Sequence, residues 1–161
     1  MVASTAPPSA VCCPALGSLL TKLRALELTE FTKIVVMDTD LLVLRDVDEL
    51  FAFPAPAACF RGNTEQRPGA QRDSRSFYDS NGNRHGGINA GVMVLEPSKL
   101  HFDRMCRNLW DQDYSAFASR GPEQDFLTEY YGGCEGWRAL PVKYNFQPHQ
   151  LGSGPREAKA E

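Results

Sequence analysis

Runs of apolar residues along this chain are interrupted by polar stretches, and the runs predict its strands. Four consecutive apolar residues at 34–37, rich in β-branched side chains, lead directly into Asp38 and Asp40. A run of this kind is typical of a strand buried on both faces, as in a parallel sheet. The runs at 41–44 and 92–95, the latter led into by residues 88–91, are expected to be buried in the same way. Shorter strands are expected at residues 57–60 and 137–142.

Apolar residues at helical spacing predict helices on either side of these strands. The first is expected over residues 18–28, the second from Pro97 onward, and the third from Pro122 to Gly132. A short helical turn is expected at 46–51, with Leu50 and Phe51 in the core. This order of elements predicts an α/β sandwich. The apolar helix positions are Leu19, Leu23, Leu26, Phe102, Met105, Cys106, Leu109, Trp110, Phe126, Leu127, Tyr130 and Tyr131.

The polar stretch at 61–87 predicts a long loop, and loops of this length are usually functional lids or disordered insertions. Residues 79–83 briefly imitate a calcium loop. However, Arg84 stands where the turn needs glycine, and Ala90 stands where a bidentate glutamate is needed. We therefore expect no calcium site there.

Composition limits the classes of function. The chain has 161 residues, 42% of them hydrophobic, which allows one domain with a real core, here expected over residues 18–150. A net charge of -3 without a basic block argues against nucleic acid as a partner, and no apolar run reaches the length of a membrane span. Five cysteines, of which two are adjacent at 12 and 13 and three are scattered, predict free thiols rather than a disulfide framework or zinc site. Residues 1–17 are expected to form a disordered leader and residues 151–161 a frayed tail.

Asp38 and Asp40 are the first candidate functional residues. Strand alternation places both carboxylates on one side, with Thr39 opposite, at the strand end where α/β sheets bind ligands. Two converging carboxylates suit Mg²⁺ or Mn²⁺. The alternative is that these acids lie in a solvated turn or cap a helix, because such triplets are common by chance.

The wider set of motifs resembles glycosyltransferase family 8, the family of glycogenin and of plant galactinol and glucuronyl transferases. The resemblance implies a partial GT-A fold with a mixed, mainly parallel sheet. It also implies a UDP-sugar donor, retention of configuration, Mn²⁺ (or Mg²⁺), and a carbohydrate, polyol or protein acceptor. The matching blocks, in family order, are residues 20–23, 33–51 with Asp38-Thr39-Asp40, 89–98, 123–127 and 140–145.

The resemblance also implies roles for individual residues. Asp38 and Asp40 would hold the metal ion, and Asp38 would also contact the ribose. The alternatives stay open: Lys22 could be solvated, Asn89 could bond the turn backbone, and the acid-glutamine pair could be ordinary first-turn helix residues. The implied sugar contacts are Lys22 and Asn89, and the implied catalytic residues are Gln124, beside the reacting carbon, and its neighbour Glu123.

The chain departs from the family pattern in three places. No uracil-binding strand is recognisable ahead of the first helix, and the acid-glutamine-glycine motif ends in Asp125. The closing His-x-x-Gly-x-x-Lys motif is not matched, because Pro155 takes the lysine place after His149, which we interpret as a frayed histidine. The chain is therefore expected to be a fragment with weak or no transferase activity.

Two other functions remain as alternatives. A nucleotidyltransferase also uses paired acids at a strand end, although the phosphate loop that it needs is not found. A decayed, non-catalytic binding module would keep the fold without Mn²⁺-dependent UDP binding. The residues do not name the sugar, the acceptor or the oligomeric state. They favour a cytoplasmic location, since a Golgi location would require an anchor upstream.

Overall fold

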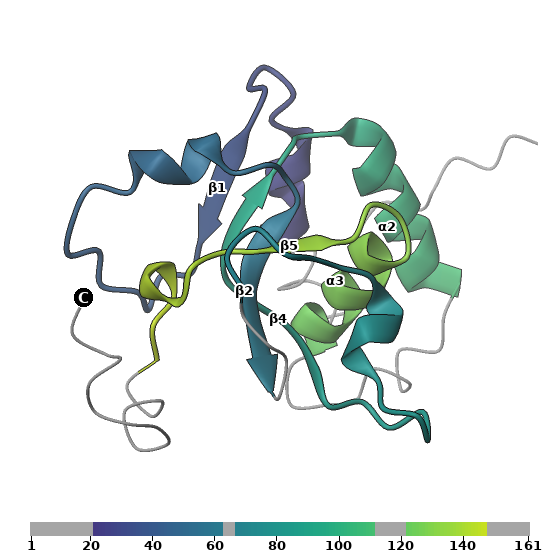
Figure 1. The fold of residues 1–161 in the computed structure, drawn as a ribbon. Helices are drawn as coiled ribbons and strands as arrows, with labels where there is room; N and C mark the ends of the chain where they lie inside the picture. Colours follow the sequence, from purple (N-terminus) through teal and green to yellow (C-terminus); the bar gives the residue numbers. More distant parts are fainter. Residues whose placement is uncertain (1–20, 63–66, 112–121, 148–161) are drawn as a thin grey trace, which may run out of the picture.

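One mixed sheet forms the centre of the molecule. The structure is a computed structural model that describes residues 21–62, 67–111 and 122–147. Within these ranges the sheet has five strands in the order β1-β4-β2-β5-β3 (Figure 1). The strands are β1 (Ile34–Met37), β2 (Ala57–Gly62), β3 (Gln71–Arg72), β4 (Gly86–Leu95) and β5 (Trp137–Ala139).

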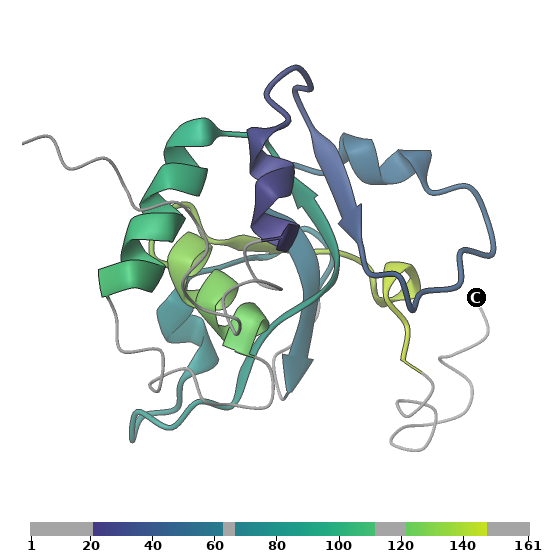
Figure 2. The same cartoon turned by 180° about the vertical axis from the view of Figure 1, so that it is seen from behind.

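Helices and turns cover both faces of the sheet. The longer helices, α2 and α3, lie with η1 against one face, and η2 and η5 lie on the other side (Figures 1 and 2). Residues 21–23 are α-helical and continue into η1. The layers confirm the predicted α/β class. The helices are η1 (Arg24–Glu27), η2 (Asp48–Ala52), η3 (Ser74–Phe77), α2 (Lys99–Asp111), α3 (Pro122–Gly132) and η5 (Val142–Tyr144).

Each face of the sheet carries its own hydrophobic cluster. The larger one fills the space under α2 and α3 and includes Met93, Leu127 and the fully buried Trp137. The Trp137 indole N–H donates to the Leu127 carbonyl over 3.0 Å, so the ring is buried without an unpaired donor. The smaller cluster, around Leu50 and Val92, closes the other face. Because β4 contributes to both clusters, it is the best-buried strand of the sheet.

The direction of strand pairing corrects one expectation. Strand β1 pairs with β4, β4 with β2, and β3 with β5, all antiparallel, and of the described pairings only β2 with β5 is parallel. The sheet is mixed, as predicted, but not mainly parallel. Among the described strands β1 is also an edge strand, and each of its residues is half-buried rather than enclosed on both faces.

The apolar run at 41–44 was wrongly predicted to be buried. Leu42 is 83% exposed and Leu44 is 81% exposed. The chain leaves the sheet through a turn after β1, so this run has no strand partner within the described residues. In the short helix that follows, Leu50 is buried as expected, but Phe51 is 47% exposed.

The stretch expected to be one long loop contains structure of its own. It includes β2's last residues, β3, η3 and a bridge between Tyr78 and Arg84. Phe77 is fully buried and anchors η3 to the core. Asp79 accepts hydrogen bonds from the backbone amides of Asn81 and Asn83, both over 2.8 Å, so the calcium-like sequence is an Asx turn.

Two further expectations concern the last strand and the cysteines. Strand β5 ends at Ala139, so the predicted strand at 137–142 is shorter than expected and gives way to η5. Cys59 is buried, Cys106 is half-buried and Cys134 is exposed, and all three are free thiols. In the described part of the chain, no helix has both the length and the apolar character needed to cross a membrane.

Candidate active site

A bulge in β4 is the structural origin of the candidate site. Ala58 on β2 pairs with Met93, whereas the next residue, Cys59, pairs with Asn89. Residues 90–92 of β4 therefore bulge away from regular pairing with β2. Bulges re-aim side chains and main-chain groups, and they are common beside active sites.

Helix α3 supplies hydrogen-bond partners to the main chain of β4 at this point. The Ala90 amide donates to the Gln124 side-chain oxygen over 3.0 Å. One turn further along the helix, the Thr128 hydroxyl accepts from the Ile88 amide over 3.1 Å. Strand β1 pairs with β4 only from Val92 onward. Side chains of α3 therefore bind the part of the β4 edge that β1 does not reach.

Lys22 joins three of these elements through its ammonium group. Its Nζ lies 2.6 Å from Asp38 Oδ1 and 2.7 Å from Glu123 Oε1. It also donates to the Ala90 carbonyl over 3.3 Å, so the ammonium contacts oxygen atoms from three separate parts of the chain. The Lys22 side chain is only 17% exposed. It is therefore not the solvated surface lysine of the alternative interpretation.

The pKa of Lys22 reflects a balance between burial and its partners. Burial alone lowers this pKa, but the hydrogen bonds to Asp38 and Glu123, with their negative charge, outweigh it. The pKa of Lys22 is therefore raised above its ordinary value, and the group is a cation throughout the physiological range. This cation lies between two carboxylates that come from different elements.

A second group of amides lies beside the bulge. Asn89 Oδ1 accepts from the Gly91 amide over 3.0 Å, which is the local backbone bond considered as an alternative role. Asn145 is only 5% exposed. A Cβ built on Gly91 would lie 3.0 Å from Asn145 Nδ2 and 3.2 Å from Asn89 Oδ1. A side chain at Gly91 would crowd both amides, so Gly91 and Asn145 lie beside the candidate site although sequence reasoning gave them no role.

The two predicted metal ligands differ in their surroundings. Asp38 is bound by Lys22, and its backbone amide donates to the Gly91 carbonyl over 2.9 Å. Asp40 is exposed. Their carboxylate oxygens are the hard donors that Mn²⁺ and Mg²⁺ prefer. Within the described ranges no three His, Cys, Asp or Glu residues are grouped as a metal site. His149 lies outside the described residues.

Asp125 is a further residue that sequence reasoning missed, since it was noted only as a departure from a motif. It is 3% exposed and forms ion pairs with Arg61 and Arg84, the latter over 3.1 Å. The signal that could have found it is weak: an acid within the apolar side of a helix, and two arginines within a polar stretch.

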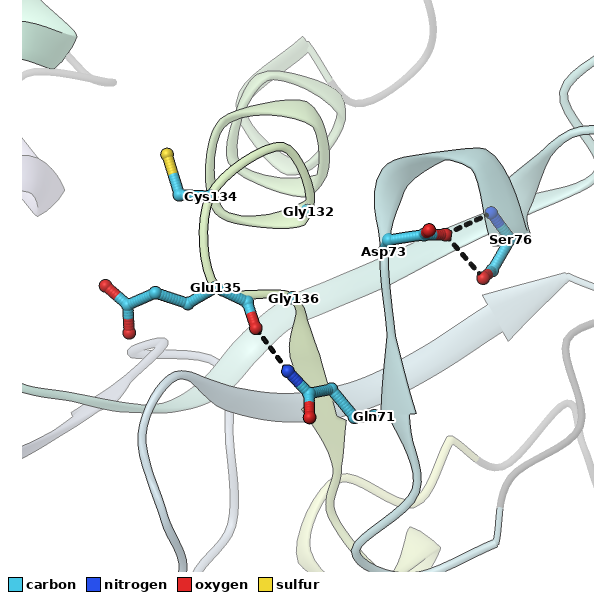
Figure 3. Close-up of a pocket in the computed structure, with 7 residues that line it drawn as sticks. All are labelled: Gln71, Asp73, Ser76, Gly132, Cys134, Glu135 and Gly136. Atoms are coloured by element: carbon cyan, nitrogen blue, oxygen red, sulfur yellow. Dashed lines mark hydrogen bonds between the residues drawn. The ribbon is translucent and has the colours of Figure 1, made fainter.

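A cavity of about 440 Å³ lies at the far end of α3 from these residues (Figure 3). Its polar groups are already engaged locally. Asp73 accepts from the Ser76 amide over 2.9 Å and from its hydroxyl over 2.7 Å, and Gln71 donates to the Glu135 carbonyl. None of the candidate residues lines it, so we do not assign the site to this cavity.

Comparison with known proteins identifies the family. Residues 17–161 match the model of glycosyl transferase family 8. An uncharacterised protein of Acanthamoeba polyphaga mimivirus is 35% identical over 127 residues, covering 79% of this chain and 43% of that protein. A putative UDP-glucuronate:xylan alpha-glucuronosyltransferase 3 of Arabidopsis thaliana is 30% identical over 128 residues, covering 80% of this chain and 16% of the plant protein.

Glycogenin-1 of Caenorhabditis elegans is also similar to most of this chain. It is 30% identical over 131 residues, which cover 81% of this chain and 24% of glycogenin-1. The chain thus spans less than half the length of each of these relatives. The family model, in contrast, covers nearly the whole chain. The α/β sheet and the match over residues 17–161 agree, and the chain belongs to glycosyltransferase family 8.

Proposed function

We propose that this chain carries the donor site of a retaining glycosyltransferase, which moves a hexosyl group from a UDP-sugar to an acceptor hydroxyl. The observation that carries the proposal is the Lys22 ammonium, which lies within 2.7 Å of both Asp38 and Glu123 and next to the Gln124–Ala90 contact. Residues far apart in the sequence are thereby held around one point.

Within this proposal each residue has a defined task. Asp38 and Asp40 would hold Mn²⁺, which when bound neutralises charge on the leaving diphosphate. Lys22 and Asn89 would bind hydroxyls of the donor sugar, and Gln124 would lie beside the reacting carbon. Glu123 keeps the Lys22 ammonium in place through the ion pair. The names of the plant relatives support UDP-glucuronate as one donor to test, together with UDP-glucose and UDP-galactose.

The experiment is calorimetric titration of UDP into the purified chain, with and without Mn²⁺. Asp38→Asn and Asp40→Asn are the test variants, and Asp48→Asn is the control because Asp48 is an exposed acid on η2, outside the site. We expect UDP binding that requires Mn²⁺, is at least tenfold weaker in both test variants, and is unchanged in the control. A tenfold loss corresponds to about 1.4 kcal/mol.

Two results would contradict the proposal. UDP binding that does not depend on Mn²⁺ would contradict the metal role of the two aspartates. A well-folded chain that does not bind UDP with Mn²⁺ present would favour the non-catalytic binding module. Product analysis with each UDP-sugar then measures transfer directly and tests the expectation of weak activity.

A further inference from the structure

The Asp125 carboxylate is the best-buried acidic group in the described part of the chain. The residue is 3% exposed and follows Gln124 directly on α3. Its Oδ1 is contacted by Arg61 Nη2 and lies 3.1 Å from Arg84 Nη1. An acid at this depth is tolerated only when it is paired and hydrogen-bonded. The two guanidinium groups therefore explain why this helix carries aspartate here.

The same two arginines also bind the main chain of β4. Arg61 Nε donates to the Ile88 carbonyl over 3.0 Å. Arg84 Nε donates to the Gly86 carbonyl over 2.9 Å. The rigid, planar guanidinium can hold a backbone carbonyl and a carboxylate at once, which lysine cannot do with fixed geometry. Each arginine therefore ties β4 to α3.

The surroundings of Arg84 are shaped to hold it in this position. Its Nη1 lies 3.7 Å from Glu129, which also accepts from the Tyr78 hydroxyl over 2.6 Å. A Cβ on Gly87 would lie 3.0 Å from Arg84 Nη2. The absent side chain at Gly87 thus gives the guanidinium its space.

We propose that Arg61 and Arg84, acting through Asp125, are positioning residues that hold Gln124 against β4 for sugar transfer. The inference rests on the proposed function, because it takes Gln124 as the residue beside the reacting carbon. The Gln124–Ala90 hydrogen bond lies next to the clamp formed by Arg61, Arg84 and Asp125. Loosening the clamp frees α3 to shift relative to β4, and this shift moves the Gln124 amide.

Hydrogen exchange of single backbone amides, followed by NMR, tests the clamp without any substrate. Arg84→Gln is the test variant, since Asp125→Asn would remove the one carboxylate that both guanidinium groups contact and could prevent folding. We expect the Ala90 amide to exchange about ten- to a hundredfold faster, beyond any change in global stability, because a hydrogen bond to a charged group is lost. Leu50→Ala, in the cluster on the other face, is the control for general destabilisation.

A double-mutant cycle on catalysis tests the link to Gln124. Arg84→Gln should lower kcat about ten- to a hundredfold, as small misplacements of a catalytic group do, with little change in KM for the UDP-sugar. In a Gln124→Ala background the same substitution should have no further effect. A kcat loss of equal size in both backgrounds would overturn the proposal, and so would unchanged exchange at Ala90.

The two arms separate this inference from the proposed function. If the wild-type chain does not bind UDP with Mn²⁺ present, the proposed function fails, whereas the exchange rates still decide whether the arginines hold β4 and α3 together. If transfer occurs and Arg84→Gln leaves kcat unchanged, the positioning role fails alone.

Discussion

The Nζ of Lys22 lies 2.6 Å from Oδ1 of Asp38, joining the helical turn before η1 to the end of β1. Glu123, at the start of α3, binds the same ammonium over 2.7 Å. One cation thus connects three elements that are far apart in the sequence. Without the Lys22 cation, the carboxylates of Asp38 and Glu123 would repel each other.

Replacing Lys22 by methionine should therefore affect both stability and function. We expect the free energy of unfolding to fall by about 1–3 kcal/mol, because hydrogen bonds to two charged groups are lost. The measurement is the urea midpoint at constant m-value. Lys99→Met is the control, since the Lys99–Asp103 pair is exposed and should contribute less than about 1 kcal/mol. Equal losses in the two variants would show that the Lys22 contacts carry no special weight.

The raised pKa of Tyr78 predicts how the stability of the fold changes with pH in alkaline solution. Burial, and then the hydrogen bond to Glu129, raise the pKa of Tyr78 to about 12. The unfolded chain loses the Tyr78 proton near pH 10. The stabilisation that comes from the raised pKa is therefore complete below pH 10 and is lost as the pH rises to 12. Unfolding measured from pH 9 to 12 should show a steeper loss in wild type than in Tyr78→Phe. An equal loss of stability with pH in wild type and Tyr78→Phe would contradict the raised pKa of Tyr78.

Gly91→Ala tests the close packing of the two amides at the bulge. The new Cβ would lie 3.0 Å from Asn145 Nδ2, so a neighbour must shift, and such overpacking costs about 1–3 kcal/mol. In an Asn145→Ala background the same substitution should be tolerated better, because the nearer amide is gone. Denaturant unfolding of the four proteins measures this coupling. Strict additivity would show that the amide is not the obstacle.

Leu42 and Leu50 give a direct contrast within one apolar part of the sequence. Leu42 is 83% exposed, and Leu42→Lys should change stability by no more than about 0.5 kcal/mol. Leu50 is 1% exposed, and Leu50→Ala should cost about 2–5 kcal/mol. Thermal or denaturant unfolding distinguishes them. A large loss in Leu42→Lys would mean that the run at 41–44 is buried after all.

The elements that could be predicted are those whose periodic apolar residues meet the core. Met105 and Leu109 on α2, and Leu127 on α3, are buried at the expected helical spacing. Residues 92–95 of β4 are buried, as their apolar run indicated, although the strand begins earlier, at Gly86. These patterns are local, and the local spacing alone determines which side of an element is apolar.

The features that could not be predicted depend on which segments become neighbours. An apolar run reports burial but not pairing direction, so the antiparallel contact of β1 with β4 was missed. The run at 41–44 has the same composition as a strand, yet no described strand pairs with it. Arg84 and Asp125 form an ion pair between distant parts of the chain, and no spacing in the sequence predicts that pair.

The candidate residues were found through the order of motifs rather than through geometry. Lys22 lies off the apolar stripe of its helix, and only tertiary contacts give it two carboxylate partners. The motif that suggested Gln124 contains no information on its Ala90 contact. Their roles in transfer remain predictions for the experiments above.

Ala90 makes its two site contacts entirely through peptide-bond atoms: its N–H donates to Gln124 and its carbonyl accepts from Lys22. No codon change at this position deletes either atom, unless proline removes the N–H. A larger side chain would instead meet the packed core, because Ala90 is fully buried. Isolating these contacts therefore requires chemical synthesis, in which an ester linkage replaces one amide and removes a single proton donor.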